Sequence, residues 1–169
     1  MELRETETTG EARGVVVSEC GERARAVLEG ILARMGLESK VSVREEPERM
    51  VLEVSGGETG MVIGKKGQTL DALQFLMNKI INRDREGTKQ IVVDSEGYRG
   101  RRAEALVALA KRLAEKVVRS GKPVEMEPMP PGDRRIVHVA LSDYPGVSTH
   151  SEGDGPLRVL VIEPTGRRR

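Results

Sequence analysis

Two lysines lie between two glycines in the segment Gly64-Lys65-Lys66-Gly67, which is the part of the sequence best suited to holding an anion. Glycine lets another backbone approach closely, and lysine supplies a mobile positive charge. A nucleotide-binding P-loop is excluded on two counts. Gly60 and Gly64 enclose three residues where a P-loop has four, and Lys66 stands where a magnesium-binding hydroxyl is needed.

The surroundings of this loop favour binding of a sugar-phosphate backbone. A helix expected to begin at Gln68 would direct free N–H groups and a partial positive charge toward a phosphate. Val62 and Ile63 come just before the loop and would line the apolar side of a groove. This arrangement is that of the Gly-x-x-Gly loop of KH domains, which holds about four unpaired nucleotides. The alternative is an ordinary joint between two helices, because glycine is common in turns.

Composition narrows the classes of protein that fit. The 169 residues carry a net charge of +1, but residues 1–96 hold 14 basic and 18 acidic side chains and residues 97–169 hold 14 and 9. Anion binding is therefore expected mainly in the second half. Aromatic residues make up 2% of the chain, which excludes folds that stack bases on a sheet of aromatics. Cys20 is the single cysteine, so an internal disulfide and a cysteine-based zinc site are excluded.

Hydrophobic spacing predicts the elements that position the loop. Apolar residues at intervals of three and four predict a helix from Ser18 to Gly36 and another after Gly67. Strands are predicted at 41–44, 50–54 and 90–93. The second half is predicted to contain a helix over 98–120, a short helix over 133–141, and two strands around 147–150 and 158–162. Residues 1–17 lack periodicity and are expected to form a disordered tail.

Several ordered motifs carry a resemblance to a known family. The stretch from Gly64 to Leu76 resembles the KH domain of the bacterial Jag family, also called KhpB or EloR. Further segments resemble the same family: Glu96-Gly97-Tyr98-Arg99, Gly121-Lys122-Pro123-Val124, Arg134-Arg135-Ile136-Val137-His138 and Ser151-Glu152-Gly153-Asp154-Gly155-Pro156-Leu157. The resemblance implies an α+β fold of two small domains. A type II KH domain of three strands and three helices would span 18–96. An R-three-H domain, a small antiparallel sheet with two helices, would span 97–165, with a basic tail at 166–169.

The R-three-H domain is named for an Arg and a His separated by three residues, here Arg134 and His138. Four residues along a helix bring both side chains to one face. Arginine can bind a phosphate through two hydrogen bonds, and histidine can donate or stack. Arg135 lies three residues before His138 and could share this role. Without the resemblance, His138 would be interpreted as a structural histidine; His150 and Cys20 are assigned no role.

The resemblance implies non-enzymatic binding of single-stranded RNA by Val62, Ile63, the Gly64–Gly67 loop, Gln68, Arg134, Arg135 and His138, with no cofactor and no metal. It further implies a post-transcriptional regulator or RNA chaperone linked to cell elongation and envelope homeostasis. A smaller KH-domain protein or a second copy is the expected protein partner. Two alternatives stay open: single-stranded DNA as the ligand, and a scaffold whose KH domain mainly mediates dimerisation. Family members commonly carry a separate N-terminal domain where this chain has about 17 polar residues, so roles that depend on that domain are not carried over.

No apolar run approaches the roughly 18 residues that span a bilayer. The polar start of the chain has no apolar core like that of a secretory signal. These observations predict a cytoplasmic protein without membrane insertion.

Overall fold

The structure is a computed structural model that describes residues 17–83 and 89–166. Contacts divide the chain into two compact units. The first comprises Leu70–Val93 and the chain up to Val62; the second comprises Ile63–Thr69 and the chain from Asp94 onward. The predicted tails lie outside the described residues except for Val17 and Gly166. Among the described helices, none has the length and apolar character required to cross a membrane.

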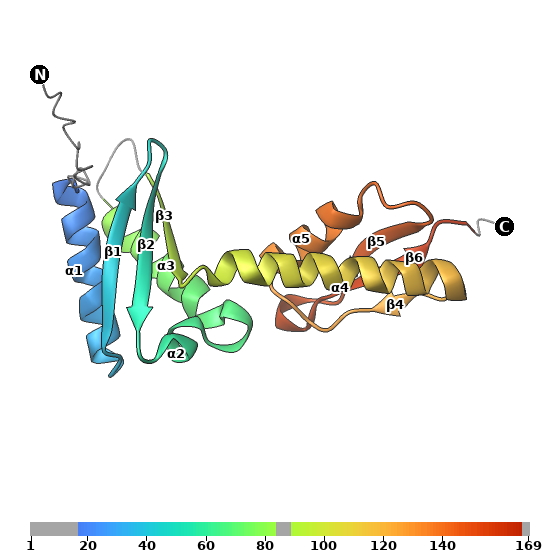
Figure 1. The fold of residues 1–169 in the computed structure, drawn as a ribbon, viewed down its shortest axis with the longest axis horizontal. Coiled ribbons are helices and arrows are strands. Elements are labelled where there is room, and N and C mark those ends of the chain that lie inside the picture. Colours follow the sequence, from blue (N-terminus) through green and yellow to red (C-terminus); the bar gives the residue numbers. More distant parts are fainter. Residues whose placement is uncertain (1–16, 84–88, 167–169) are drawn as a thin grey trace, which may run out of the picture. The chain divides into compact units, whose positions relative to one another are not determined.

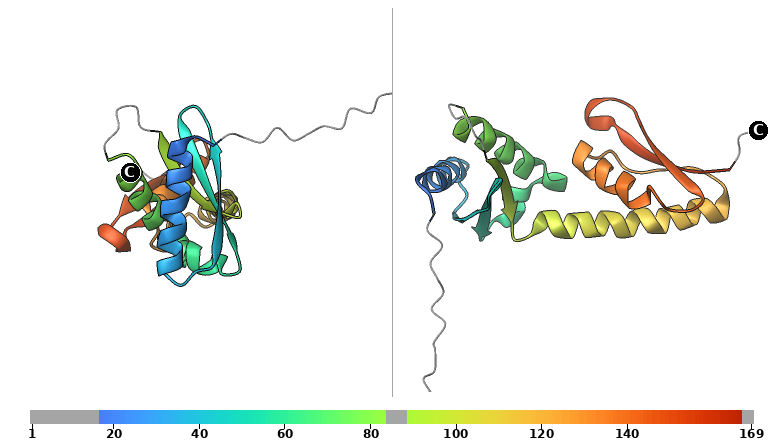
Figure 2. Two further views of the ribbon diagram at one scale, coloured as in Figure 1. Left: turned by 90° about the vertical axis from the view of Figure 1, so that its left-hand side faces the viewer. Right: turned by 90° about the horizontal axis from the view of Figure 1, so that it is seen from above.

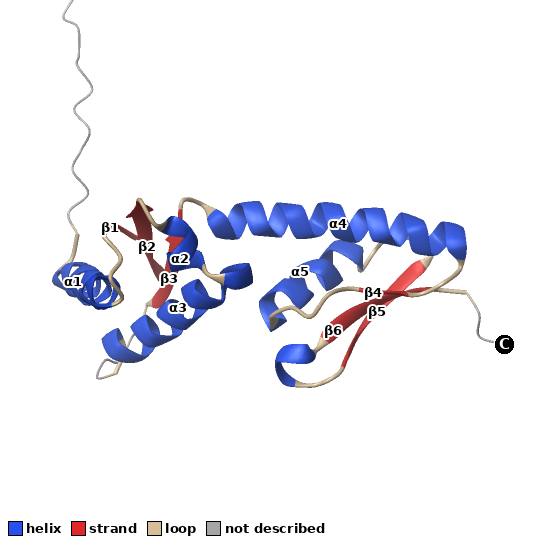
Figure 3. Ribbon diagram, turned by 90° about the horizontal axis from the view of Figure 1, so that it is seen from below, coloured by secondary structure: helices blue, strands red, loops and turns tan. Residues whose placement is uncertain are grey.

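The first unit is a three-stranded sheet with helices on one face (Figures 1 and 3). The strands lie in the order β1-β2-β3, and β1 and β2 are antiparallel with Val41 opposite Val54. The elements in chain order are α1 (Glu19–Arg34), β1 (Ser39–Glu45), β2 (Arg49–Gly56), α2 (Thr59–Ile63), α3 (Gln68–Ile81) and β3 (Gln90–Ser95). All of the predicted strands and helices of this half are present.

Local signals explain where α1 begins and ends. The Ser18 hydroxyl accepts a hydrogen bond from the Gly21 N–H at 3.1 Å, which satisfies one free donor of the first turn. Ser18 in turn donates from its N–H and its hydroxyl to Glu45, at 2.9 and 2.6 Å. These bonds lower the pKa of the Glu45 carboxyl and tie the start of α1 to the end of β1. Gly36 has a φ of 77°, the left-handed conformation that commonly follows a helix.

The core of the first unit lies between the helices and the sheet. Its apolar side chains recur every three or four residues on the helices and every second residue on β2 and β3, as each geometry requires. Fully or almost fully buried are Ala24, Leu28, Leu32, Leu52, Val54, Leu70, Leu73, Met77, Ile91 and Val93.

The second unit packs two helices against a second three-stranded sheet (Figures 1 and 2). Its elements are α4 (Tyr98–Ser120), β4 (Val124–Glu125), α5 (Pro131–Leu141), β5 (Val147–Glu152) and β6 (Val159–Pro164). The antiparallel sheet has the order β4-β6-β5, with Thr149 opposite Ile162. The core residues shared by the helices and the sheet include Leu106, Ala110, Ala114, Val117, Val137, Leu141, Leu160 and Ile162.

The predicted α+β fold with two small sheets is confirmed, with two local differences. The two-residue strand β4 was not predicted, because its only signal is pairing with Ile162 and Val161 far along the chain. Helix α5 begins at Pro131, two residues before the predicted start at Asp133. Proline is favoured in the first helical turn, where its missing N–H would have no partner anyway.

Candidate nucleic-acid interface

The Gly64–Gly67 loop is a tight joint between α2 and α3. Its backbone passes through a left-handed φ of 69° at Gly64 and 85° at Gly67, with a short 3-10 turn over Lys65–Gly67 between them. A side chain at Gly64 would overlap the hydroxyl of Thr69, and a β-carbon at Gly67 would lie 2.9 Å from the Tyr98 ring. Both glycines are therefore required by the fold of the loop itself. The sequence indicated only that they let a ligand backbone approach closely.

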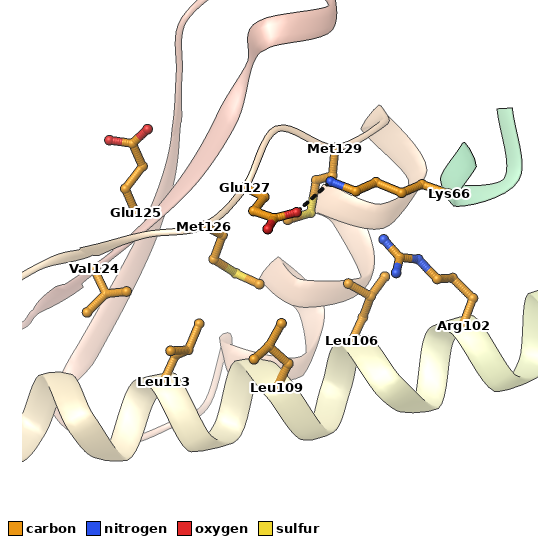
Figure 4. A pocket seen from close by; sticks show the side chains of 10 residues that line it. All are labelled: Lys66, Arg102, Leu106, Leu109, Leu113, Val124, Glu125, Met126, Glu127 and Met129. Atoms are coloured by element: carbon orange, nitrogen blue, oxygen red, sulfur yellow. Dashed lines mark hydrogen bonds and ion pairs between the residues drawn. The ribbon is translucent and has the colours of Figure 1, made fainter.

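The two lysines of the loop differ in their surroundings. Lys65 is exposed and makes no ion pair with the described residues. Lys66 has an unusual left-handed φ of 54°, and its Nζ donates to Glu127 Oε2 at 2.8 Å and to the Pro128 carbonyl oxygen at 3.1 Å (Figure 4). The bond from Lys66 lowers the pKa of the Glu127 carboxyl. Lys65 is thus available to bind an anion, whereas Lys66 already pairs with the Glu127 carboxylate.

The residues flanking the loop have unequal access to a ligand. Gln68 is exposed and is the first residue of α3, whose 14 residues begin directly after the loop. The Gln68 N–H donates to the Lys65 carbonyl, and the helix start carries a partial positive charge that favours an anion. Ile63 is partly buried, but Val62 is completely buried. The Val62 side chain therefore supports the loop from within rather than offering a surface.

A second cationic site lies where α5 faces β5. Arg134 donates from a terminal guanidinium nitrogen to Ser151 Oγ at 3.2 Å, and His138 Nδ1 lies 2.6 Å from Thr149 Oγ1. Because Thr149 and Ser151 are two residues apart on a strand, both hydroxyls face α5. They hold the predicted Arg134 and His138 side chains side by side along a pocket of about 380 Å³, which Arg135 also lines.

Arg158 adds a further guanidinium to this pocket. The Nε atoms of Arg134 and Arg158 are buried and make no hydrogen bond to any described residue. Nor does either arginine form an ion pair within residues 17–83 and 89–166. Cations held together without an ion-pair partner of their own create a positive potential that attracts an anion.

His150 also borders the pocket, but its charge is compensated. Its Nε2 lies 2.8 Å from Glu152 Oε1 and its Nδ1 lies 3.4 Å from Glu163 Oε1. The hydrogen bond that His150 donates to Glu152, aided by the charge of Glu163, raises the pKa of His150. A protonated His150 is therefore neutralised by two carboxylates and adds little to the field of the arginines.

Sequence reasoning missed Arg158, Thr149, Ser151 and His150 as members of this pocket. Alternation along the predicted strand could have placed Thr149 and Ser151 on one face. Nothing local marks Arg158, because it reaches the site only through the pairing of β5 with β6. Among the described residues, no group of three or more His, Cys, Asp and Glu side chains is placed to hold a metal ion.

Comparison with known proteins identifies both halves of the chain. A family model of the KhpA/KhpB KH domain matches residues 23–93, and a model of the R-three-H domain matches residues 104–164. The chain is 38% identical over 143 residues to the RNA-binding protein KhpB of Clostridium symbiosum, covering 83% of this chain and 64% of that protein. It is 37% identical to RNA-binding protein KhpB of Bacillus subtilis, covering 83% and 69%. For the Streptococcus pneumoniae protein of the same name the identity is 30%, over 82% of this chain and 42% of the relative.

Proposed function

This chain belongs to the KhpB family, and from that premise we propose that it binds single-stranded RNA without catalysing a reaction. The observation that carries the proposal is the pocket on α5, where Arg134 and Arg158 lie together with no acidic partner among the described residues. The relatives bear the name RNA-binding protein, which supports the same conclusion.

The Gly64–Gly67 loop would supply the first grip on the RNA backbone. The exposed Lys65 and the partial positive charge at the start of α3 favour a phosphate at this point, and Lys66 can contribute once the phosphate displaces Glu127. KH loops of this kind hold about four nucleotides. In this proposal Gln68 and Ile63 border the strand, and Val62 fixes the loop from the core.

The α5 pocket would supply the second grip. Arg134 presents a planar guanidinium suited to two hydrogen bonds with a phosphate, and Arg135 and His138 flank it. We propose that the KH domain spans 18–96 and the R-three-H domain spans 97–165, each carrying one of the grips. Two modest grips on one strand bind more tightly than either alone when the linkage lets both engage.

Charge reversal in the loop tests the proposal. Lys65→Asp combined with Lys66→Asp should weaken binding of a short unpaired RNA about tenfold or more, since phosphate contacts become repulsions. Aspartate tolerates the left-handed backbone at position 66, so the loop should keep its shape. Lys40→Asp with Lys111→Asp is the matched control, because both lysines are exposed and the charge change is the same.

If both double variants weaken RNA binding equally, the loss reflects only the change in net charge, and the loop is rejected as a grip. Magnesium-dependent cleavage of the RNA that disappears in His138→Ala would overturn the non-enzymatic part of the proposal. Competition between RNA and DNA of one sequence decides between the two single-stranded ligands, and tighter binding of RNA is expected.

In the cell we propose a cytoplasmic post-transcriptional regulator or RNA chaperone, linked to cell elongation and envelope homeostasis. The resemblance of the two domains to the KhpB family supports this role. Crosslinking in cells followed by sequencing of the bound RNA should recover a defined set of transcripts. If the native chain recovers no more RNA than the Lys65→Asp/Lys66→Asp variant does, this role is contradicted.

A specific surface favours protein pairing as a second function. Phe75, Leu76 and Ile80 on α3 are 61, 44 and 38% exposed, which is unusual for large apolar side chains near one another on a helix. We propose that a second copy or a smaller KH-domain protein covers them. Light scattering should detect a dimer that Phe75→Ser abolishes. The same mass for the native chain and for Phe75→Ser would reject pairing through this face.

A further inference from the structure

A separate pocket of about 270 Å³ lies between α4 and the segment Val124–Met129 (Figure 4). Its walls are apolar and come from three positions on one face of the helix and three on the facing segment. They are formed by Leu106, Leu109, Leu113, Val124, Met126 and Met129. The proposed grips on phosphate use none of these side chains.

The rim of this pocket carries both signs of charge. Lys66 and Arg102 line it together with Glu125 and Glu127, and the Lys66–Glu127 bond lies at the rim (Figure 4). Arg102 also donates to Asp133 at 2.9 Å. The pocket therefore combines an apolar interior with donors and acceptors fixed at its edge.

We propose that this pocket receives one unstacked base of the RNA strand whose backbone lies on the Gly64–Gly67 loop. A nucleobase has apolar faces and a polar edge, which match the walls and the rim. Lys66 belongs to both the rim and the loop, so a strand on the loop has a base within reach of the opening. The chain is poor in aromatics, and leucine and methionine side chains would contact the base in their place.

An acyl chain or an apolar peptide side chain fits less well, because the part that would enter the apolar interior carries no donors and acceptors of its own to meet both the carboxylates and the cations of the rim. The inference rests on the proposed binding of RNA, since the base arrives with the strand. The base adds affinity that does not depend on salt, whereas the lysines and arginines supply the salt-dependent part.

The test uses the whole chain and a short unpaired RNA carrying 2-aminopurine at one position at a time. One position should brighten on binding, because the base leaves its stacked neighbours and enters the pocket. Removing the base at that position, with the sugar and phosphate kept, should weaken binding about fivefold or more, comparable to the lower end of the effect of stacking one base on an aromatic side chain.

Leu109→Phe fills the pocket from a partly buried position and should remove both the brightening and the sensitivity to the missing base. Ala108→Phe is the matched control, because Ala108 is exposed on the same helix outside the pocket lining. It should leave both signals unchanged. The RNA with the missing base tests the idea in the native protein, even if Leu109→Phe proves unstable.

RNA binding that is sensitive to Lys65→Asp/Lys66→Asp but shows no brightening and no effect of any missing base overturns the pocket and leaves the proposed function standing. Equal weakening of the intact and base-free strands by Leu109→Phe also overturns it. If the native chain binds a fluorescent fatty acid, and Leu109→Phe abolishes that binding but leaves the RNA affinity unchanged, the pocket belongs to an acyl chain instead. Absence of any RNA binding by the native chain rejects the proposed function itself.

Discussion

Neutralising Lys65 and Lys66 one at a time should change the salt dependence of RNA binding by different amounts. Each freely available cation that meets a phosphate of a single strand contributes about 0.7 to the slope of log K against log salt. Lys65 is exposed and has no ion-pair partner among the described residues. Lys65→Gln should therefore make the slope shallower by about 0.7.

Lys66 should contribute less because Glu127 holds its ammonium at 2.8 Å in the free protein. RNA must displace this carboxylate before a phosphate can take its place. Salt weakens both the Lys66–Glu127 ion pair of the free protein and the Lys66–phosphate contact of the complex. Their contributions to the salt dependence of RNA binding therefore partly cancel. Lys66→Gln should change the slope by clearly less than Lys65→Gln does.

Glu127→Gln provides the internal check. It removes the competing carboxylate, so it should tighten RNA binding and restore the full contribution of Lys66 to the salt slope. In that background, Lys66→Gln should again make the slope shallower by about 0.7. Fluorescence anisotropy over a series of potassium chloride concentrations measures all of these slopes. Equal slope changes for the two single lysine variants, or no effect of Glu127→Gln, would show that Glu127 does not compete with RNA for Lys66.

Three other substitutions have effects that follow from the structure. Gly67→Ala should destabilise the protein by about 2 kcal/mol in urea unfolding, because its φ is 85° and the new methyl group would meet Tyr98. Gly100→Ala should instead stabilise it by about 0.4–1 kcal/mol, since Gly100 lies within α4 with open space around it; a loss there would contradict the account. The raised pKa of His150 implies a contribution to stability that is complete below its ordinary pKa of 6.5 and is lost as the pH rises through the folded-state pKa. Glu152→Gln should lower the pKa of His150, as followed by NMR titration of the ring, and an unchanged pKa would reject the assigned cause.

Local signals in the sequence were enough to predict the helices. Ser18 and Gly36 bound α1, and α4 runs from Tyr98 to Ser120 before Gly121, as its spacing predicts. Each of these signals acts within one or two turns of helix, so no knowledge of the tertiary fold is needed. The predicted Arg134 and His138 lie together for the same reason, being one turn apart on α5.

Contacts between distant parts of the chain could not be predicted in this way. Glu127 lies 61 residues beyond Lys66, and no local pattern in either segment indicates their bond. Arg158 reaches the α5 pocket through the register of β5 with β6. The sequence thus indicated Lys65, Lys66, Arg134, Arg135 and His138 as candidate cations, but neither Arg158 nor the pairing of Lys66 with Glu127.

The most direct test of the central claim is a map of amide chemical shifts in the isotope-labelled protein as unpaired RNA is added. The amides of Gly64–Gln68 and those around Arg134 and His138 should move together and saturate at one RNA concentration. Shifts confined to other surfaces, with both of these segments unmoved, would contradict it.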